Sequence, residues 1–218
     1  MLFGNDIVSL LLCIPAALIA LTVHEYCHGY VAFRLGDPTA RSLGRLSLNP
    51  IRHLDLLGTL LMVLFGFGFA KPVPVNPRYF KDPRKGMALV AAAGPLSNLL
   101  LAFIGALLYR LTRLLLGVVN LAVWANFILL LAAFFLAFHL LNLSLCVFNL
   151  LPLPPLDGSR IFYVFLPPRA YWGVMKHERT IQIVLLVALW LGAFSGLINT
   201  FVGWISSGMF WLINLIIP

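Results

Sequence analysis

This chain of 218 residues has little charge, few acidic side chains and few cysteines, and each shortage excludes a class of protein. Charged residues make up 10% of the sequence and hydrophobic residues 61%, so there is too little polar surface to coat a water-soluble globule of this size. The three cysteines all lie in apolar stretches, and an odd count at such positions does not form a disulfide framework. The composition predicts a protein of the lipid bilayer.

Only seven residues are acidic, against 15 Lys and Arg, which gives a formal net charge of +8. The basic residues are scattered through connecting segments and do not gather into one soluble basic domain. Nucleic acid is therefore not an expected partner. The tendency of cytoplasmic loops to be basic explains the excess better.

Four long apolar segments are candidates for membrane spans. They cover residues 7–33, 87–109, 122–150 and 181–217. The last is long enough for one tilted span plus an interfacial helix, or for a tight hairpin. No stretch is long or polar enough to form a separate soluble domain, such as a PDZ-like or nucleotide-sensing (CBS) domain. We therefore expect one membrane unit.

A fifth apolar segment, residues 58–70 (GTLLMVLFGFGFA), has only 13 residues and is too short for a comfortable helical crossing. We predict that it enters the membrane and returns to the same side. Nine basic residues flank it, and a full crossing would divide them between the two sides. With a re-entrant segment, thirteen basic residues share the cytoplasmic side and only Arg110 and Arg113 lie outside, as the positive-inside rule favours.

The stretches on either side of this short segment contain LGRLSLNP and AKPVPVNP. Alternation in the first and prolines in the second are typical of short strands or extended edges. The predicted fold class is therefore an all-α polytopic membrane protein with a small membrane-associated β element.

The sequence HEYCH, from His24 to His28, stands at the end of the first apolar segment. With five His and two Glu in the chain, an accidental His-Glu-x-x-His is expected about once in a thousand such chains. On the first transmembrane helix, His24 and His28 would project from the same face and could close on one tetrahedral Zn²⁺. Glu25 lies beside them, placed to accept a proton from a metal-bound water. Ionisable groups at membrane depth are costly and usually functional, which argues against a purely structural cluster.

A catalytic zinc ion normally takes three protein ligands, so a third must come from elsewhere in the chain. Asp157, in NLLPLPPLDGSR, emerges on the same side as the two histidines if segment 58–70 is re-entrant, and on the opposite side if that segment crosses. Prolines 152, 154 and 155 prevent regular helix just before it and free the backbone to turn. The other candidates lie at the far end of the first helix, in basic loops or well inside an apolar span: Asp6, Asp37, Asp55, Asp82 and His139.

Three motifs in this order, HEYCH, AGPLSN and NLLPLPPLDG, resemble those of the site-two protease family of intramembrane zinc metalloproteases. The resemblance covers residues 7 to 165, or about three-quarters of the chain. It implies one Zn²⁺ per chain held by His24, His28 and Asp157, with Glu25 activating water. It also implies a short membrane-associated sheet that pairs with the substrate.

By the same analogy, Asn98 and Asn149 lie near the site and bind substrate. Other roles for both follow from the residues themselves. Asn98 comes soon after Gly94-Pro95, and its amide could equally hydrogen-bond carbonyls freed by a kink. Asn149 stands at a helix end and could be a plain cap.

We expect a metalloprotease core over residues 1–165, followed by a C-terminal connection and membrane helix or hairpin over residues 166–218. The predicted function is hydrolysis of peptide bonds within or near transmembrane segments of membrane-protein substrates. The substrate and the lipid bilayer are the expected partners, in the cell membrane with the active site towards the cytoplasm.

Two other functions are compatible with the same residues. A transporter or ion carrier could use the His, Glu and Asp cluster as a transit site, although the chain has no internal repeat and no second set of intramembrane charges. A membrane scaffold without catalysis would have little need for Glu25 together with both histidines and Asp157.

Overall fold

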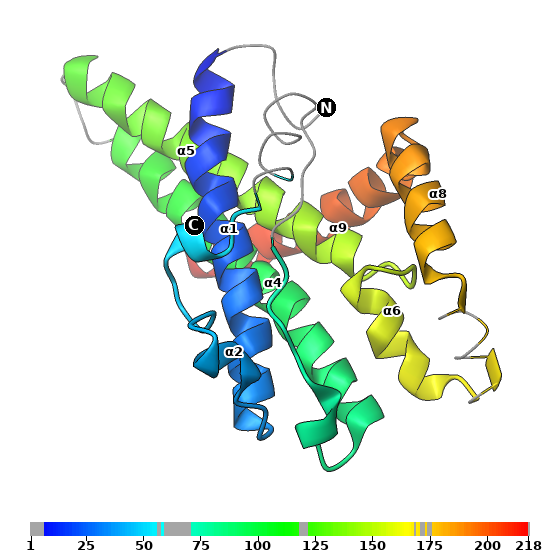
Figure 1. Cartoon of the computed structure of the whole chain (residues 1–218). Helices are drawn as coiled ribbons and strands as arrows, with labels where there is room; N and C mark the ends of the chain where they lie inside the picture. The colour runs from blue at the N-terminus through cyan, green and yellow to red at the C-terminus, as the bar shows by residue number, and fades with distance from the viewer. Residues whose placement is uncertain are drawn as a thin grey trace.

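In the computed structural model the described residues are 7–55, 58, 71–117, 122–167, 169–170, 173 and 176–217, and long helices dominate them (Figure 1). The four longest helices are α1 (Ile7–Arg34), α4 (Pro83–Leu116), α5 (Ala122–Asn149) and α9 (Ser195–Ile216). The shorter ones are α2 (Thr39–Ser42), α6 (Asp157–Phe162) and α8 (Glu178–Trp190), with 3-10 turns η1 (Pro50–Arg52), η2 (Pro77–Tyr79) and η3 (Tyr163–Phe165).

Four helices in the described part of the chain are long and apolar enough to cross a membrane: Leu11–Arg34, Pro83–Leu116, Trp124–Asn149 and Ser195–Ile216. The all-α polytopic prediction is thereby confirmed. The apolar segment 181–217 divides into α8, which is shorter, and α9, with a turn between them. Gly192 in that turn has a φ of +73°, a value that favours glycine. The segment therefore contains one helix long enough to cross a membrane and a second, shorter helix before it.

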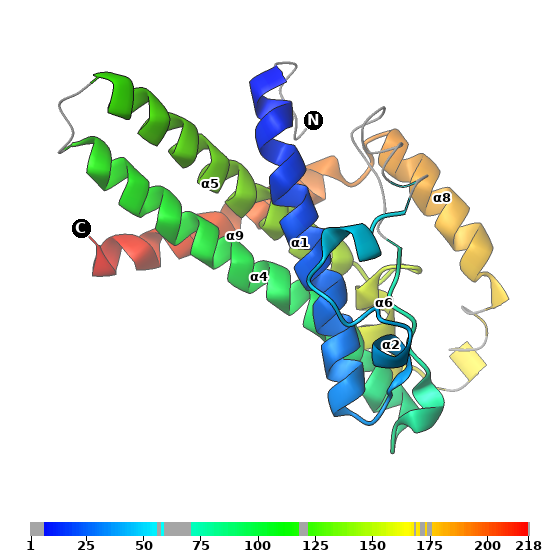
Figure 2. The same ribbon diagram turned by 60° about the vertical axis from the view of Figure 1, so that its left-hand side comes forward.

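Contacts between the long helices define their directions (Figures 1 and 2). Helix α1 runs antiparallel to α4, since Asn98 contacts Ala20 and Val90 contacts His28. Helix α5 returns along α4, with His139 Nδ1 at 2.8 Å from the carbonyl oxygen of Ala102. The end of α5 therefore lies at the same end of the molecule as the end of α1 and the beginning of α4, as the re-entrant topology requires.

Helix α9 packs against α4 and α5 and has the same direction as α4. Ser206 Oγ lies 2.8 Å from His139 Nε2, and the carbonyl of Ile217 near the end of α9 accepts from Arg110 near the end of α4. The predicted interior His139 is thus satisfied by a backbone carbonyl and a serine on two neighbouring helices. Hydrogen bonds of this kind between helices stabilise their association in lipid, where the hydrophobic effect contributes little.

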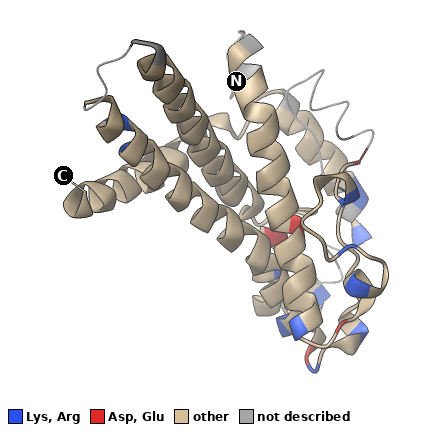
Figure 3. Cartoon of the chain, turned by 90° about the vertical axis from the view of Figure 1, so that its left-hand side faces the viewer, with Lys and Arg blue, Asp and Glu red and all other residues tan. Residues whose placement is uncertain are grey.

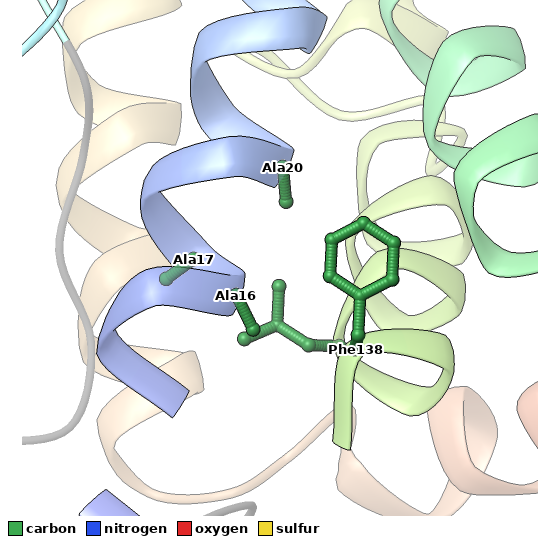
Figure 4. Packing of buried hydrophobic residues seen from close by; sticks show 5 residues of the cluster. Ala16, Ala17, Ala20 and Phe138 are labelled. Atoms are coloured by element: carbon green, nitrogen blue, oxygen red, sulfur yellow. The ribbon is translucent and has the colours of Figure 1, made fainter. Parts of the chain in front are cut away.

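Small side chains allow α1 and α5 to approach closely (Figure 4). Ala16, Ala17 and Ala20 of α1 are buried against Phe138 and Leu141 of α5. Small residues at the contact let helix backbones come near enough for good van der Waals packing, which is a main source of helix association in membranes.

The predicted β element is not confirmed. Most of segment 58–70 lies outside the described residues, and neither of its described flanks, 43–49 and 71–76, forms a strand. Residues 71–76 are extended, but Pro72 and Pro74 have no N–H to donate to a ladder. Carboxylates of the α1 region bind this stretch instead, since the N–H of Asn76 donates to the buried Asp37 at 2.7 Å.

The two flanks of the short apolar segment meet. The backbone N–H of Lys71 donates to the carbonyl of His53 at 2.8 Å. Lys and Arg gather around this region, at the end of the molecule where α1 ends, and a smaller group lies towards the far end of α4 (Figure 3). Both flanks therefore belong to the basic end of the molecule.

We expect cysteines introduced singly in place of Arg41 and Lys81 to react with a membrane-impermeant reagent from the same side of the membrane. The reason is that their two flanks meet and carry the basic residues that favour the cytoplasm. The measurement is thiol labelling of sealed vesicles of either orientation, in a protein whose three native cysteines are replaced. Labelling of the two positions from opposite sides would contradict the topology.

Candidate metal centre

Three potential metal ligands converge where α1 meets the start of α6. Nε2 of His24 and Nε2 of His28 are 2.9 Å apart, as expected for residues four apart on one helix. Asp157 Oδ2 lies 3.1 Å from the first nitrogen and 3.2 Å from the second. One ligand atom from each residue lies within 4.8 Å of the others, and both imidazoles are buried. The three sequence-predicted ligands are thus brought together.

Asp157 reaches the histidines because the chain turns sharply after α5. Residues 150–156 carry three prolines and form turns, and α6 begins at Asp157 itself. Gly158 packs so closely beneath this turn that an added Cβ would meet the carbonyl oxygens of Leu150 and Leu151. The Asp-Gly pair therefore has a physical reason, since the carboxylate faces the site while the glycine allows close contact with the preceding loop.

The hydrogen bonds on the far side of each imidazole show which nitrogen carries the proton. His28 Nδ1 lies 2.7 Å from the carbonyl oxygen of Val90, which can only accept, so Nδ1 is the protonated nitrogen. His24 Nδ1 lies 2.5 Å from Asn98 Oδ1, and with the amide turned this way Nδ1 is the donor there too. Both Nε2 atoms therefore turn unprotonated lone pairs towards each other and towards the Asp157 carboxylate.

Three facing acceptors repel one another unless a cation lies among them. Two neutral imidazoles and a carboxylate are a usual donor set for catalytic zinc, and bonds from the outer ring nitrogens to protein acceptors are its usual support. The residues present fit a zinc ion.

Glu25 lies beside the ligands on the wall of a cavity of about 460 Å³. Its Oε2 accepts the backbone N–H of Val73 at 2.8 Å, which joins α1 to the extended stretch 71–76. The cavity is lined by both histidines, Asp157, Asn149, Arg160 and residues 72–75. A carboxylate with one oxygen fixed beside an open cavity can serve as a proton acceptor.

The two asparagines differ in position. Asn98 is fully buried, does not line the cavity, and supports His24 from behind. Asn149 does line the cavity, although its Nδ2 donates to the carbonyl of Leu145 one turn earlier. Of the two, only Asn149 therefore borders the cavity.

Gly94 is a residue of the site to which neither the AGPLSN motif nor the predicted kink assigned a role of its own. A Cβ built at Gly94 would lie 2.5 Å from His24 Cε1 and 2.5 Å from His28 Nε2. The glycine thus leaves room for both imidazoles against α4. Its position one turn before Asn98, on the helix that packs against HEYCH, was the available signal.

Gly94→Ala is expected to lower zinc affinity by at least about 10-fold, the scale of changes next to metal ligands, because its methyl group occupies the space of both imidazoles. Gly203→Ala in α9 is the matched control, since a Cβ there meets nothing within 4 Å and alanine suits a helix. The measurement is zinc per protein after dialysis against a mild chelator. Equal zinc retention in the two variants would contradict the packing described.

A helix bearing His24, Glu25 and His28, a distant Asp157 and a cavity between membrane helices are the features of a membrane metalloprotease. The model of peptidase family M50 matches residues 112–195. The "Putative zinc metalloprotease YwhC" of Bacillus subtilis is 48% identical over 170 residues, 78% of this chain and 76% of the relative. The chain belongs to peptidase family M50, the site-two protease family.

More distant relatives have the same kind of name. The "Putative zinc metalloprotease Rip2" of Mycobacterium tuberculosis is 33% identical over 204 residues, 91% of this chain and 71% of the relative. The "Putative zinc metalloprotease MJ0611" of Methanocaldococcus jannaschii is 33% identical over 108 residues, 49% of each chain. No solved structure matched. The protein is thus a multi-pass membrane protein of a zinc metalloprotease family, and the comparisons give no support to a transporter.

Proposed function

We propose that this chain is an intramembrane zinc endopeptidase that hydrolyses peptide bonds within or near transmembrane segments of other membrane proteins. The observation that carries the proposal is the convergence of three acceptor atoms, from His24, His28 and Asp157, between membrane helices. Groups of this polarity at membrane depth are costly and mark function. A soluble substrate would not require a site at this depth.

In this proposal His24, His28 and Asp157 hold one Zn²⁺ per chain. The ion would lower the pKa of a water molecule and polarise the carbonyl to be attacked. Glu25 accepts the proton of the attacking water and donates it to the departing amide nitrogen. The N–H of Val73 engages Oε2 of Glu25, and in this proposal the other carboxylate oxygen accepts the proton.

The substrate backbone is proposed to bind in extended form beside residues 71–76. Pro72, Val73, Pro74 and Val75 of this stretch line the cavity. A helix must be partly unwound before a protease can reach its carbonyls, and an extended neighbour can hydrogen-bond the exposed backbone. Asn149 supports this arrangement with a side-chain amide on the same cavity wall.

The cell membrane, with the active site towards the cytoplasm, is the proposed location. The argument is that the basic end of the molecule contains the end of α1, the start of α4 and the α5–α6 turn, and cytoplasmic segments are enriched in Lys and Arg (Figure 3). The substrate and the surrounding bilayer are then the partners of the chain.

Proteomic comparison of membranes tests the proposal in cells. Cells that carry Glu25→Gln in place of the active protein are expected to accumulate one or a few uncleaved transmembrane proteins and to lose their shorter products. The same comparison with Gly203→Ala, outside the site, provides the control. Identical membrane proteomes in the Glu25→Gln and active cells would count against proteolysis.

A further inference from the structure

The hydrogen bonds behind His24 continue beyond Asn98. Asn98 Nδ2 donates to Oδ1 of Asn142 on α5 at 2.9 Å, and Asn142 Nδ2 donates to the carbonyl oxygen of Phe138 at 2.9 Å. Both asparagine side chains are fully buried between the membrane helices. A chain of three hydrogen bonds thus joins His24 on α1 to the backbone of α5.

The direction of this chain is set at its α5 end. The carbonyl of Phe138 can only accept, so the nitrogen of Asn142 must face it and the oxygen of Asn142 must face Asn98. Asn98 must then turn its nitrogen to Asn142 and its oxygen to His24. The result is that His24 Nδ1 must be the donor and Nε2 remains free for a metal.

Asn98 alone does not impose this direction. The oxygen and nitrogen ends of an amide have nearly the same shape, and a reversed Asn98 would present N–H to His24 Nδ1. The proton of His24 would then move to Nε2, the nitrogen that faces Asp157 and His28. The contact from Asn98 Nδ2 to the carbonyl of Ala20 is long, at 3.5 Å, and resists reversal only weakly.

We propose that Asn142 is a positioning residue of the metal centre, which fixes the metal-binding tautomer of His24 through Asn98. His28 needs no such device, because the carbonyl of Val90 accepts from it directly. Each histidine is therefore controlled by a backbone carbonyl, one through direct contact with α4 and one through two amides that end on α5. The inference rests on the proposed zinc centre and assigns a role to a residue about which neither the HEYCH nor the NLLPLPPLDG motif gives information.

Removal of the Asn142 oxygen tests the proposal. Asn142→Leu removes the acceptor oxygen but keeps the side-chain volume, whereas Asn142→Ala removes both. Each is expected to lower zinc affinity by about 10-fold or more, as happens when a residue that hydrogen-bonds a metal ligand is lost. Asn142→Asp keeps an oxygen acceptor for Asn98 and, as the protonated acid, also a donor for the carbonyl of Phe138, so it is expected to bind zinc as the unaltered protein does. The readouts are zinc per protein after dialysis against a mild chelator and the visible absorption of the Co²⁺-loaded protein.

A second substitution distinguishes tautomer control from packing. In the Asn142→Leu background, Asn98→Asp supplies a carboxylate that accepts from His24 Nδ1 whichever way it is turned, so zinc retention is expected to recover. A purely structural role of Asn142 would not be repaired by a change at Asn98. Ser206→Ala removes a partly buried hydrogen bond between α9 and α5, the one to His139, and is the control expected to leave zinc affinity unchanged.

His24→Ala separates this inference from the proposed function. If His24→Ala loses zinc while Asn142→Leu and Asn142→Ala keep normal affinity and an unchanged Co²⁺ spectrum, the role of Asn142 is wrong and the metal centre stands. Failure of Asn98→Asp to restore zinc to Asn142→Leu would equally overturn the tautomer argument. If His24→Ala itself retains zinc as the unaltered protein does, the metal centre is wrong, and the role of Asn142 falls with it.

Discussion

Replacement of Glu25 by Gln is expected to abolish peptide hydrolysis while leaving zinc in place. The amide keeps an oxygen that can accept the N–H of Val73, so the contact to the extended stretch 71–76 is preserved. It cannot accept a proton from water, and the loss of a general base costs at least about 100-fold in rate. The three ligands His24, His28 and Asp157 are untouched.

Metal content and hydrolysis must be measured on the same preparation of Glu25→Gln. Activity close to that of the unaltered protein would show that Glu25 is not the proton acceptor. Loss of zinc together with activity would show that Glu25 supports the ligands rather than the reaction. The expected result is full zinc content with hydrolysis reduced at least about 100-fold, and this result differs from both of those outcomes.

Asp157→Ala is expected to have the opposite effect, a loss of zinc. The substitution removes the carboxylate that approaches both imidazoles, at 3.1 and 3.2 Å, and leaves two histidines. Two neutral ligands without an anion hold Zn²⁺ far less tightly, and a fall in affinity of at least about 10-fold is expected, since even outer-partner changes have effects of this size. Activity falls with the metal.

Asp82→Asn and Asp55→Asn are the controls for Asp157→Ala. Asp82 is an exposed cap of α4 that accepts from the N–H groups of Arg84 and Lys85, and asparagine caps helices as well. Asp55 accepts from the N–H of Gly58, far along the chain from the metal ligands. Both variants are expected to retain normal zinc after dialysis against a mild chelator. Full retention by Asp157→Ala with loss in a control would identify a different third ligand.

Much of the candidate site could be predicted from the sequence because its chemistry is local. His24, Glu25 and His28 lie within one and a half turns of helix, so their spacing alone predicts that both imidazoles share a face. Asp157 is distant in sequence, but few acidic residues compete with it and the order of the membrane segments limits which side it reaches. Scarcity of charge made this prediction possible.

The remaining features depend on how helices face each other, which composition and spacing do not determine. Gly94 and Asn98 were visible as part of a motif, but their roles depend on the rotation of α4 against α1. Gly94 makes room for the imidazoles, and Asn98 holds His24 from behind. Asn142 belongs to none of the three motifs, and its link to His24 through Asn98 depends on how α5 faces α4. Residues 71–76 were predicted to be a short strand or an extended edge, and they are extended but not assigned as a strand, with Pro72 and Pro74 lacking an N–H to donate.

The most direct test of the central claim is hydrolysis of a purified transmembrane peptide in proteoliposomes. The protein is assayed when loaded with zinc, after the zinc is removed, and after zinc is added back. The account predicts cleavage within or near the membrane-spanning part of the peptide, lost when zinc is removed, restored when it returns, and absent from Glu25→Gln at every stage. Cleavage that persists without zinc and in Glu25→Gln would contradict an intramembrane zinc endopeptidase built on His24, His28 and Asp157.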